Sequence, residues 1–200
     1  MKPHWSLTTV TDSTAEPITT AEAKAHLRVD IPDDDSYIDS LISACRRKLE
    51  REWNRAFVNQ TLRATYDTFP LDGGPIRLPR PPLTSTTSDI AVTYTNSTGG
   101  SSTWSSSDYQ VDSRSEPGRI LPAFGQSYPS TRNVQNAVTV QYVAGYGGST
   151  DIPDTIRHAV KLMVGHYYEN REPVVVGTIV AQIPDTVLNL MGAEDWGPYG

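Results

Sequence analysis

Two long stretches of the chain repeat apolar residues at the spacing of an α-helix. The first runs from about Ser36 to Arg55, and in the second the same spacing extends from Ile156 to Tyr167. The predicted apolar face of the two helices comprises Ile38, Leu41, Ile42, Cys45, Leu49, Trp53, Ile156, Val160, Met163 and Tyr167. Because each helix has one apolar face, we expect the two to pack against each other across a long separation in sequence.

Short signals mark the helix ends. Pro153 suits the first turn of the second long helix, where its missing N–H costs nothing, and Pro173 stops that helix. Thr19 followed three residues later by Glu22 is a capping-box pattern, which predicts a short helix through about Arg28.

Between the two long helices, apolar and polar residues alternate, as in half-buried strands. The pattern predicts strands near residues 60–66, 76–78, 90–94, 108–112 and 138–143, with a hairpin at 96–100. Fifteen of the 24 residues from Thr84 to Ser107 are Ser or Thr, so one face of this sheet should be polar. The connection 117–136 is expected to be an ordered loop that buries Ile120, Leu121, Phe124 and Tyr128.

The predicted fold class is α+β, a small helical bundle of two long helices and shorter ones with an inserted antiparallel sheet of about four to six strands. We expect an N-terminal arm at 1–17, the two halves of the bundle at 18–59 and 149–177, and the insertion at 60–148. Residues 178–200 form a C-terminal docking tail, with one or two helical turns between Pro184 and Met191.

The charge balance argues against a surface that grips nucleic acid. Seventeen Lys and Arg stand against 23 Asp and Glu, a net charge of −6, so DNA that meets this chain should slide past it. The basic residues of the first long helix are Arg46, Arg47, Lys48, Arg51 and Arg55. Glu50 and Glu52 interleave with them and allow Arg46/Glu50 and Lys48/Glu52 pairs, which favours a solvated or subunit-facing surface over a DNA grip.

The sequence predicts assembly in a reducing cytoplasm. The single cysteine, Cys45, cannot form an intramolecular disulfide, and the N-terminus lacks the pattern of a signal peptide. The longest apolar run, Val174 to Ala181, is far short of the ~20 residues that span a bilayer, so we expect no membrane partner.

No catalytic, metal-binding or cofactor-binding motif stands out, and we expect neither an enzyme nor a cofactor. A metal-dependent hydrolase would have to use His158, His166 and Glu169, which lack the usual spacing of zinc ligands. The acidic loop from Asp30 to Asp35 fits helix caps and dipole partners better than a calcium site, because the alternating ligand spacing and central glycine of a calcium loop are missing.

Six segments together resemble one protein family. They are PITTAEAKAHLRVDIPDDDSYIDSLISACRRKLEREWNRAFVNQT (17–61), IRLPRPPL (76–83), SSSDYQVD (105–112), GRILPAFGQSYPSTR (118–132), AVTVQYVAGYG (137–147) and IPDTIRHAVKLMVGHYYENREPVVVG (152–177). In this order they resemble the head-tail connector (adaptor, or head-completion) proteins of tailed bacteriophages and gene transfer agents, in the longer form with a β insertion.

The resemblance implies a structural virion protein of the neck, without catalysis. Its subunits would form a ring, typically of twelve, beneath the portal vertex. Its partners would be the portal protein, double-stranded DNA that passes through the channel without specific binding, and a tail terminator, stopper or other neck protein. The alternative is a non-catalytic carbohydrate-binding or adhesive β module of a phage particle, which would use Trp104 and Tyr109.

The two kinds of contact that a ring needs suggest candidate residues. For contacts between subunits, a ring requires two unlike patches on one chain, and the flanks of the long helices offer Arg47, Arg51, Arg157, Lys161, Tyr168 and Arg171. For docking on the portal, the apolar residues of the glycine-rich C-terminal stretch have few local partners; they are Val187, Leu188, Leu190, Met191, Trp196 and Tyr199.

Overall fold

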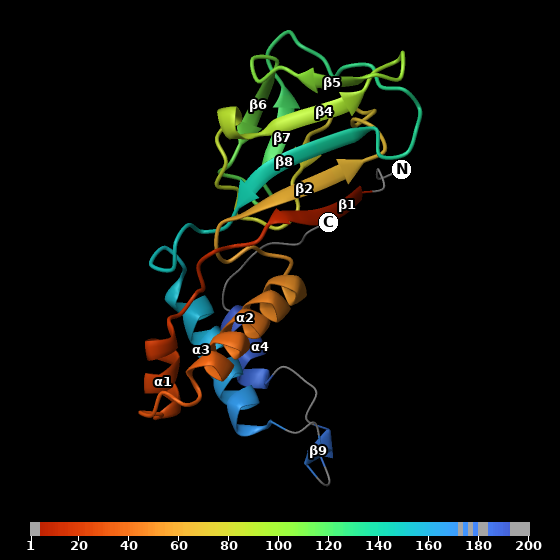
Figure 1. Ribbon diagram of the computed structural model, residues 1–200. Coiled ribbons are helices and arrows are strands. Elements are labelled where there is room, and N and C mark those ends of the chain that lie inside the picture. The colour runs from red at the N-terminus through yellow and green to blue at the C-terminus, as the bar shows by residue number, and fades with distance from the viewer. Residues whose placement is uncertain (1–4, 172–173, 176–177, 180–183, 193–200) are drawn as a thin grey trace. The chain divides into compact units, whose positions relative to one another are not determined.

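The computed structural model describes residues 5–171, 174–175, 178–179 and 184–192, and it divides the chain into two compact units (Figure 1). Of the described residues, the helical unit contains Thr14–Trp53 and those from Gly147 onward, and the sheet unit contains Asn54–Tyr146 together with residues 5–13. Each unit is therefore built from segments that lie far apart in sequence. The sheet unit occupies 54–146 and the N-terminal strand, where the sequence suggested 60–148.

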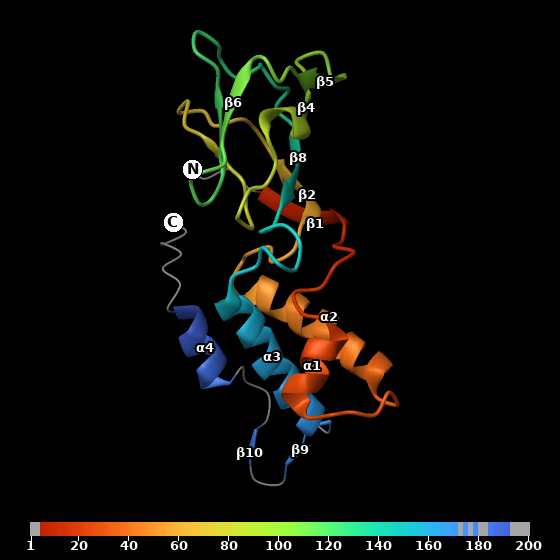
Figure 2. The same ribbon diagram turned by 90° about the vertical axis from the view of Figure 1, so that its left-hand side faces the viewer.

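The helical unit consists of α1 (Thr20–Leu27), α2 (Asp35–Glu52), α3 (Asp154–Glu169) and α4 (Asp185–Gly192). The two long helices α2 and α3 pack against each other, α1 contacts both, and α4 packs against α3 (Figure 2). A short hairpin of β9 (Val174–Val175) and β10 (Thr178–Ile179) lies between α3 and α4 in sequence. The predicted α+β class and the long helices are confirmed.

The start and end of α1 follow the predicted signals. Thr19 is the N-cap: its side chain accepts the Glu22 N–H, and the Glu22 carboxylate accepts the Thr19 N–H at 2.9 Å. At the other end, Arg28 adopts a left-handed conformation (φ 58°) and its N–H bonds to the Lys24 carbonyl. The capping box and its helix are therefore confirmed.

The facing sides of α2 and α3 form the core of the helical unit. Its fully buried side chains are Ile38, Ile42, Cys45, Leu49, Ile156, Ala159, Val160, Met163 and Val164. Leu41, Trp53 and Tyr167, which the periodicity placed on the same face, are only half-buried because they lie at its margins. Burial raises the pKa of the Cys45 thiol to about 12, so this residue acts as a small apolar side chain and not as a nucleophile.

Two arginines of the predicted basic surface are buried. Arg46 is 1% exposed, and it donates to Glu16 at 2.8 Å and to Glu50 at 3.0 Å. The predicted Arg46/Glu50 pair is confirmed, but a solvated surface at Arg46 is wrong, because the charge is neutralised inside the fold. Lys48, expected to pair with Glu52, donates instead to the Tyr167 hydroxyl at 2.6 Å.

Arg55 is also fully buried and lies in the sheet unit. It donates to Glu116 at 2.6 Å and to the Tyr146 hydroxyl at 2.7 Å. The expectation that it belongs to a surface basic patch on the first long helix is therefore wrong as well. Its carboxylate partner lies 61 positions away in sequence, beyond the reach of any local pattern.

The sheet unit holds two antiparallel sheets around one core. The larger sheet has the order β1 (Trp5–Thr11), β2 (Gln60–Tyr66), β8 (Val138–Ala144), β4 (Ala91–Thr95) and β5 (Ser101–Trp104). The smaller has the order β3 (Ile76–Arg77), β7 (Arg119–Pro122) and β6 (Tyr109–Asp112). A 3₁₀ turn at Thr87–Asp89 precedes β4. The antiparallel insertion is confirmed, with two sheets in place of the single one expected.

Residues 5–11 of the predicted N-terminal arm form strand β1. This strand pairs with β2 from Trp5, opposite Tyr66, to Thr9, opposite Leu62. Only Leu7 of β1 packs against the core, and the other side chains of the strand are exposed. Because β1 has almost no buried face, its sequence lacks the alternation that revealed the inner strands.

Aromatic rings fill the core between the two sheets. Phe69 stacks on Tyr128 with ring centroids 5.1 Å apart, and Trp104 lies 5.0 Å from Tyr109. Ile120 of β7 is fully buried in the same cluster, as predicted for the 117–136 connection. Phe124, which was also expected to be buried there, is fully exposed, so that part of the prediction is wrong.

The buried ion pair of α2 should contribute measurably to stability. Glu50→Ala leaves the buried Arg46 guanidinium without one of its two carboxylates and should lower the free energy of unfolding by about 3 kcal/mol. The matched control Glu52→Ala removes an exposed carboxylate from the same helix and should change stability by less than about 0.5 kcal/mol. Denaturant unfolding of the two variants decides the matter, and equal midpoints would contradict the role assigned to the pair.

Candidate interaction surfaces

The histidines that a hydrolase would need contact aromatic rings. His158 meets the ring of His26 edge-on with centroids 6.3 Å apart, and His166 lies 5.6 Å from Tyr167. Over the part of the chain that the structure describes, no group of three or more His, Cys, Asp or Glu side chains could hold a metal ion. Within the same residues, no helix combines the length and apolar composition that crossing a membrane requires.

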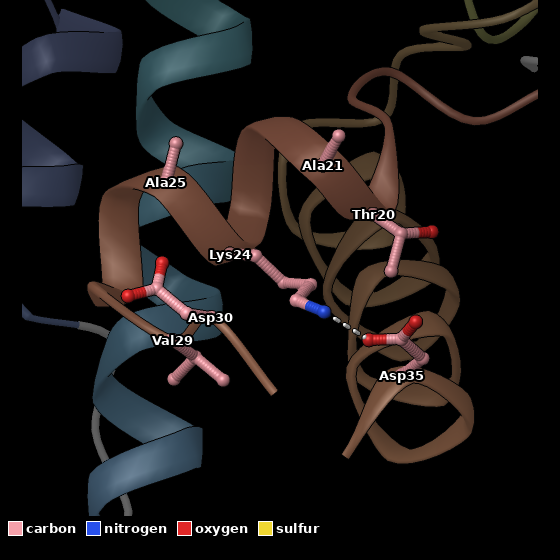
Figure 3. Close-up of a pocket in the computed structure, with 7 residues that line it drawn as sticks. All are labelled: Thr20, Ala21, Lys24, Ala25, Val29, Asp30 and Asp35. Atoms are coloured by element: carbon pink, nitrogen blue, oxygen red, sulfur yellow. Dashed lines mark hydrogen bonds and ion pairs between the residues drawn. The ribbon is translucent and has the colours of Figure 1, made fainter. Parts of the chain in front are cut away.

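A recess in the helical unit lies where α1 faces the start of α2 (Figure 3). It is open to solvent, and its lining comprises Thr20, Ala21, Lys24, Ala25, Val29, Asp30 and Asp35. Figure 3 shows Lys24 reaching from α1 to Asp35, where Nζ lies 2.6 Å from Oδ1. An open hollow spanned by an ion pair offers little enclosed apolar surface to a small molecule.

The acidic loop before α2 is tied to the end of α3. Asp34 accepts hydrogen bonds from the Tyr168 hydroxyl and from Arg171, the latter at 3.1 Å. The Tyr168 hydroxyl, followed by the charge of Arg171, holds the pKa of Asp34 below its usual value. Arg171 also stacks over the rings of Tyr37 and Tyr168, at 4.7 and 5.0 Å. Asp34 occupies the N-cap position of α2 without a side-chain capping bond, so its carboxylate joins helices rather than capping one.

Arg157 and Lys161, which were also suggested for subunit contacts, hold α1 to α3 within the chain. Arg157 donates to Glu22 and to the Pro17 carbonyl, the latter at 3.3 Å, and Lys161 Nζ lies 3.6 Å from the Glu22 carboxylate. The pKa of Glu22 is lowered chiefly by the Thr19 backbone N–H, with further contributions from Arg157 and Lys161. One carboxylate thus serves both the capping box and the packing of α1 on α3.

Of the six residues suggested for subunit contacts, four have these partners within their own chain. Tyr168 and Arg171 hold the acidic loop, and Arg157 and Lys161 hold α1. The other two, Arg47 and Arg51, are exposed on α2, and Arg47 also has an interaction within its own chain. The contacts of Tyr168, Arg171, Arg157 and Lys161 join segments about 135 residues apart in sequence, as in the bond between Arg157 and Glu22. No local sequence pattern could reveal such contacts.

The C-terminal candidates divide into a buried and an exposed set. Val187 of α4 is fully buried, so the expectation that it lacks local partners is wrong: α4 lies on α3 and turns this residue inward. Leu188 is 42% exposed, and Leu190 is half-buried. The side chain of Met191 and both Trp196 and Tyr199 lie outside the described part of the chain.

Two turns of the sheet unit carry apolar residues that the sequence reading missed as surface features. Leu71 is 93% exposed and Phe124 is 100% exposed. The pairing of Ile76 with Ile120 puts the turn before β3 and the turn after β7 at the same end of the smaller sheet. Tyr128 joins them by donating to the Gly74 carbonyl at 2.7 Å. The sequence signal that could have located these tips is a glycine shortly after each apolar residue: Gly73 after Leu71 and Gly125 after Phe124. Both glycines adopt positive φ, as turns require.

Trp104 and Tyr109, on which the carbohydrate-binding alternative depends, are core residues. They are 4% and 3% exposed, and they pack against each other and against neighbouring aromatic rings. A sugar-binding platform needs open ring faces, so the burial of these two side chains removes the observation that favoured that alternative.

The arrangement defines a class of protein: an α+β chain in which a β insertion interrupts the sequence of a helical unit. The model of the phage gp6-like head-tail connector proteins matches residues 17–120, and the chain belongs to this family. It is therefore a structural protein of phage-type particles, placed by its family in the neck between head and tail.

Solved structures with the same fold come from particles of this kind. The chain is similar to a protein in the neck of an empty gene transfer agent particle computed with sixfold symmetry, with 21% identity, a TM-score of 0.76 and coverage of 98% of this chain and 96% of that one. It is also similar to a chain in the neck of the native particle computed with twelvefold symmetry, with 22% identity, a TM-score of 0.68 and the same coverage. A third match, in a native gene transfer agent virion, has 21% identity, a TM-score of 0.74 and coverage of 94% and 93%. No curated protein sequence gives a significant match.

The tie between α1 and α3 should depend on pH. Because the pKa of folded Glu22 lies below its ordinary value of 4.5, the carboxylate stabilises the fold above that value, and this contribution is lost as the pH falls through the folded pKa. Glu22→Gln should therefore be less stable than the wild type at neutral pH, and the difference should shrink in acid. Thermal unfolding from pH 7 to pH 3 measures this.

The control for this experiment is Glu169→Gln, which removes an exposed carboxylate from the end of α3 and should follow the wild type closely. A gap between Glu22→Gln and the wild type that stays constant down to pH 3 would contradict the assigned role of the charge.

Proposed function

We propose that copies of this chain form a closed ring beneath the portal vertex, extend the DNA channel, and provide the surface to which the tail or the next neck protein attaches. The observation that carries the proposal is the likeness in fold, over 98% of the chain, to a protein in particle necks that were computed with sixfold and twelvefold symmetry. Twelve subunits is the number we favour. The protein acts by contact and has no catalytic role.

The charge distribution supports passage of DNA without capture. Among residues 5–13 and 54–146 of the sheet unit, seven acidic residues balance seven basic residues. The excess of negative charge therefore lies in the helical unit. An acidic or neutral wall does not neutralise phosphates, and so it neither releases counterions nor holds the duplex.

The larger sheet offers a hydroxyl-rich face that would suit such a wall. Strand pairing aligns Ser6, Thr65, Thr139, Thr93 and Thr103 in one row across all five strands. These side chains are exposed or half-buried. Hydroxyl groups bind water and form weak, exchangeable hydrogen bonds, which allow a passing polyanion to move.

The exposed apolar turn tips support attachment to other proteins of the neck. A fully exposed Phe124 and a nearly fully exposed Leu71, on turns at the same end of the smaller sheet, are unfavourable in water, and large apolar side chains of this kind anchor protein interfaces. Both tips are fixed by turn hydrogen bonds, such as Gln126 N–H to the Ala123 carbonyl at 2.9 Å, so a partner need not order them on binding.

Ring formation can be tested directly with purified portal complexes. The chain, added in excess, should bind each portal as a closed ring that cryo-electron microscopy resolves, with a central channel wide enough for duplex DNA. Added short duplexes should not compete for binding at physiological salt. Attachment of isolated single subunits, or no attachment at all, would overturn the proposal.

For the portal contact we propose the exposed side of α4 and the segment that follows it. Leu188→Asp should abolish docking on portals while the protein stays folded, because this side chain is 42% exposed. Val187→Ala is the matched control: it should lower the free energy of unfolding by about 2 kcal/mol, because Val187 is buried, and should leave docking intact. A pull-down with immobilised portals, together with thermal unfolding, separates the two effects. Wild-type docking by Leu188→Asp and by a chain that ends at residue 192 would exclude this surface.

A further inference from the structure

Strand β1 is held to its sheet mainly by its backbone. It forms one edge of the larger sheet, next to β2, and this pairing is its main contact (Figure 1). Of its seven side chains only Leu7 is half-buried, whereas Trp5 and Val10 are 53% and 42% exposed. The strand therefore has little side-chain packing that ties it to the sheet of its own chain.

The strands β1 and β2 are far apart in sequence although they pair in space. The helices α1 and α2 lie between them along the chain, and the paired residues Thr8 and Arg63 are 55 positions apart. A tight hairpin turn would favour pairing within one chain, but a long connection gives that pairing only a modest advantage in effective concentration. When copies of the chain are held side by side, as in the proposed ring, a neighbour's β2 offers β1 an equivalent partner.

The connection that follows β1 is short and leads into the helical unit. Glu16 accepts hydrogen bonds from Arg46 Nε at 2.8 Å and from Ser43 Oγ at 2.6 Å, so the chain is fastened there. Residues 12–15 lie between Thr11 and Glu16 without regular secondary structure, and they can span at most roughly 17 Å. A different course of these few residues would deliver β1 to an adjacent subunit without disturbing the packing of the helices.

The exposed apolar side chains of β1 fit a strand that lies at a boundary between subunits. An exposed tryptophan is unfavourable in water, and tryptophan is enriched among the residues that anchor protein interfaces. A strand that passes from one subunit to the next lies where the two meet. Trp5 and Val10 can be covered there by the neighbouring chain.

We propose that in the ring β1 of each subunit pairs with β2 of the next subunit, in the register that it has within one chain. The proposal rests on the proposed function, because it assigns a contact between subunits of that ring. The partner of each exchanged strand is a second copy of this chain.

Such an exchange costs little and suits a closed ring. Trp5 stays opposite Tyr66 and Leu7 stays opposite Ala64, because the partner has the same sequence. Each subunit gives its strand on one side and receives a strand on the other, which supplies the two unlike surfaces that a ring of identical subunits requires. Removing one subunit from the ring then breaks two strand pairings.

A mixture of two chains, each with one added thiol, tests the exchange. Ser6 and Thr65 lie opposite each other on β1 and β2, so one chain carries Ser6→Cys and the other Thr65→Cys. Equal amounts are assembled on portals, treated with a short bifunctional thiol reagent and separated by denaturing electrophoresis. Covalent dimers should form, because the two thiols meet only if the strand crosses between subunits. Cys45 is fully buried, and burial raises the pKa of its thiol to about 12, so it does not react.

The matched control mixes the Thr65→Cys chain with a Thr139→Cys chain. These residues are opposite each other on β2 and β8, which stay within one subunit, so their thiols should not meet. The first mixture should give at least about tenfold more dimer than the control, because the exchanged pairing holds its two thiols at a high effective concentration. Thermal unfolding should show all three variants to be folded, because Ser6 is exposed and Thr65 and Thr139 are only half-buried.

Placing both thiols in one chain gives the second test. Free Ser6→Cys/Thr65→Cys should form an internal link and migrate as a monomer, whereas the same chain assembled on portals should give a ladder of covalent multimers. Thr65→Cys/Thr139→Cys should give internal links in both states.

The outcomes separate this inference from the proposed function. If rings form on portals while the thiols at positions 6 and 65 link only within one chain, or do not link at all, the exchange is wrong and the ring stands. If the wild-type chain forms no ring on portals, both fail.

Discussion

The packing of α2 on α3 is the interaction on which the rest of the molecule depends. The two helices come from either side of residues 54–146, so their contact can form only if the ends of that insertion come together. Closing a disordered loop of that length would cost on the order of 4 kcal/mol. The sheet unit removes much of that cost, because Gln60 at the start of β2 pairs with Ala144 at the end of β8. The chain therefore leaves the sheet unit beside the point where it entered.

The exit from the sheet unit is fixed by close packing. Gly145 has φ +138°, and a Cβ atom there would lie 2.5 Å from the backbone of Val58 and Asn59. Its N–H bonds to the Pro82 carbonyl at 2.9 Å, and the Tyr146 N–H bonds to the Phe57 carbonyl at 3.2 Å. Gly145 is thus a site of close backbone approach, which only glycine permits.

Buried ion pairs add specificity to a fold that apolar burial stabilises. Arg46 can be neutralised only when Glu16, from the segment before α1, reaches it beside Glu50. An unpaired guanidinium in the core would be strongly destabilising, so misaligned packings of α2 are disfavoured. Arg55, with Glu116 and Tyr146, imposes the same requirement within the sheet unit. These contacts join distant segments, so they define which arrangement of the apolar faces is the native one.

The features that the sequence predicted are those that neighbouring residues stabilise. The periodicity of Ile156 through Met163 and the capping box at Thr19 report helices directly, because the residues that stabilise these elements lie within one or two turns of each other. Strand β1 and the exposure of Phe124 were missed for the opposite reason. β1 is stabilised by hydrogen bonds to β2 more than 50 residues away, and no local pattern shows whether a turn tip meets a neighbour. Among the candidate contacts, residue type alone could not separate Arg157, which holds Glu22, from Arg51, which is exposed.

The distribution of charge constrains how copies of this chain can meet. Since the sheet unit is balanced, the helical unit carries the negative excess, and two helical units brought together at random would repel each other. A stable contact between them must therefore bring an exposed cationic surface of one against an anionic surface of the other. Many cations of the helical unit, such as Arg46, Arg157 and Arg171, already have carboxylate partners in their own chain. Exposed cations of the helical unit can offset that repulsion only in an orientation that puts a neighbour's carboxylates against them. The same excess of negative charge that suits the proposed passage of DNA also restricts the orientation in which copies of the chain can associate.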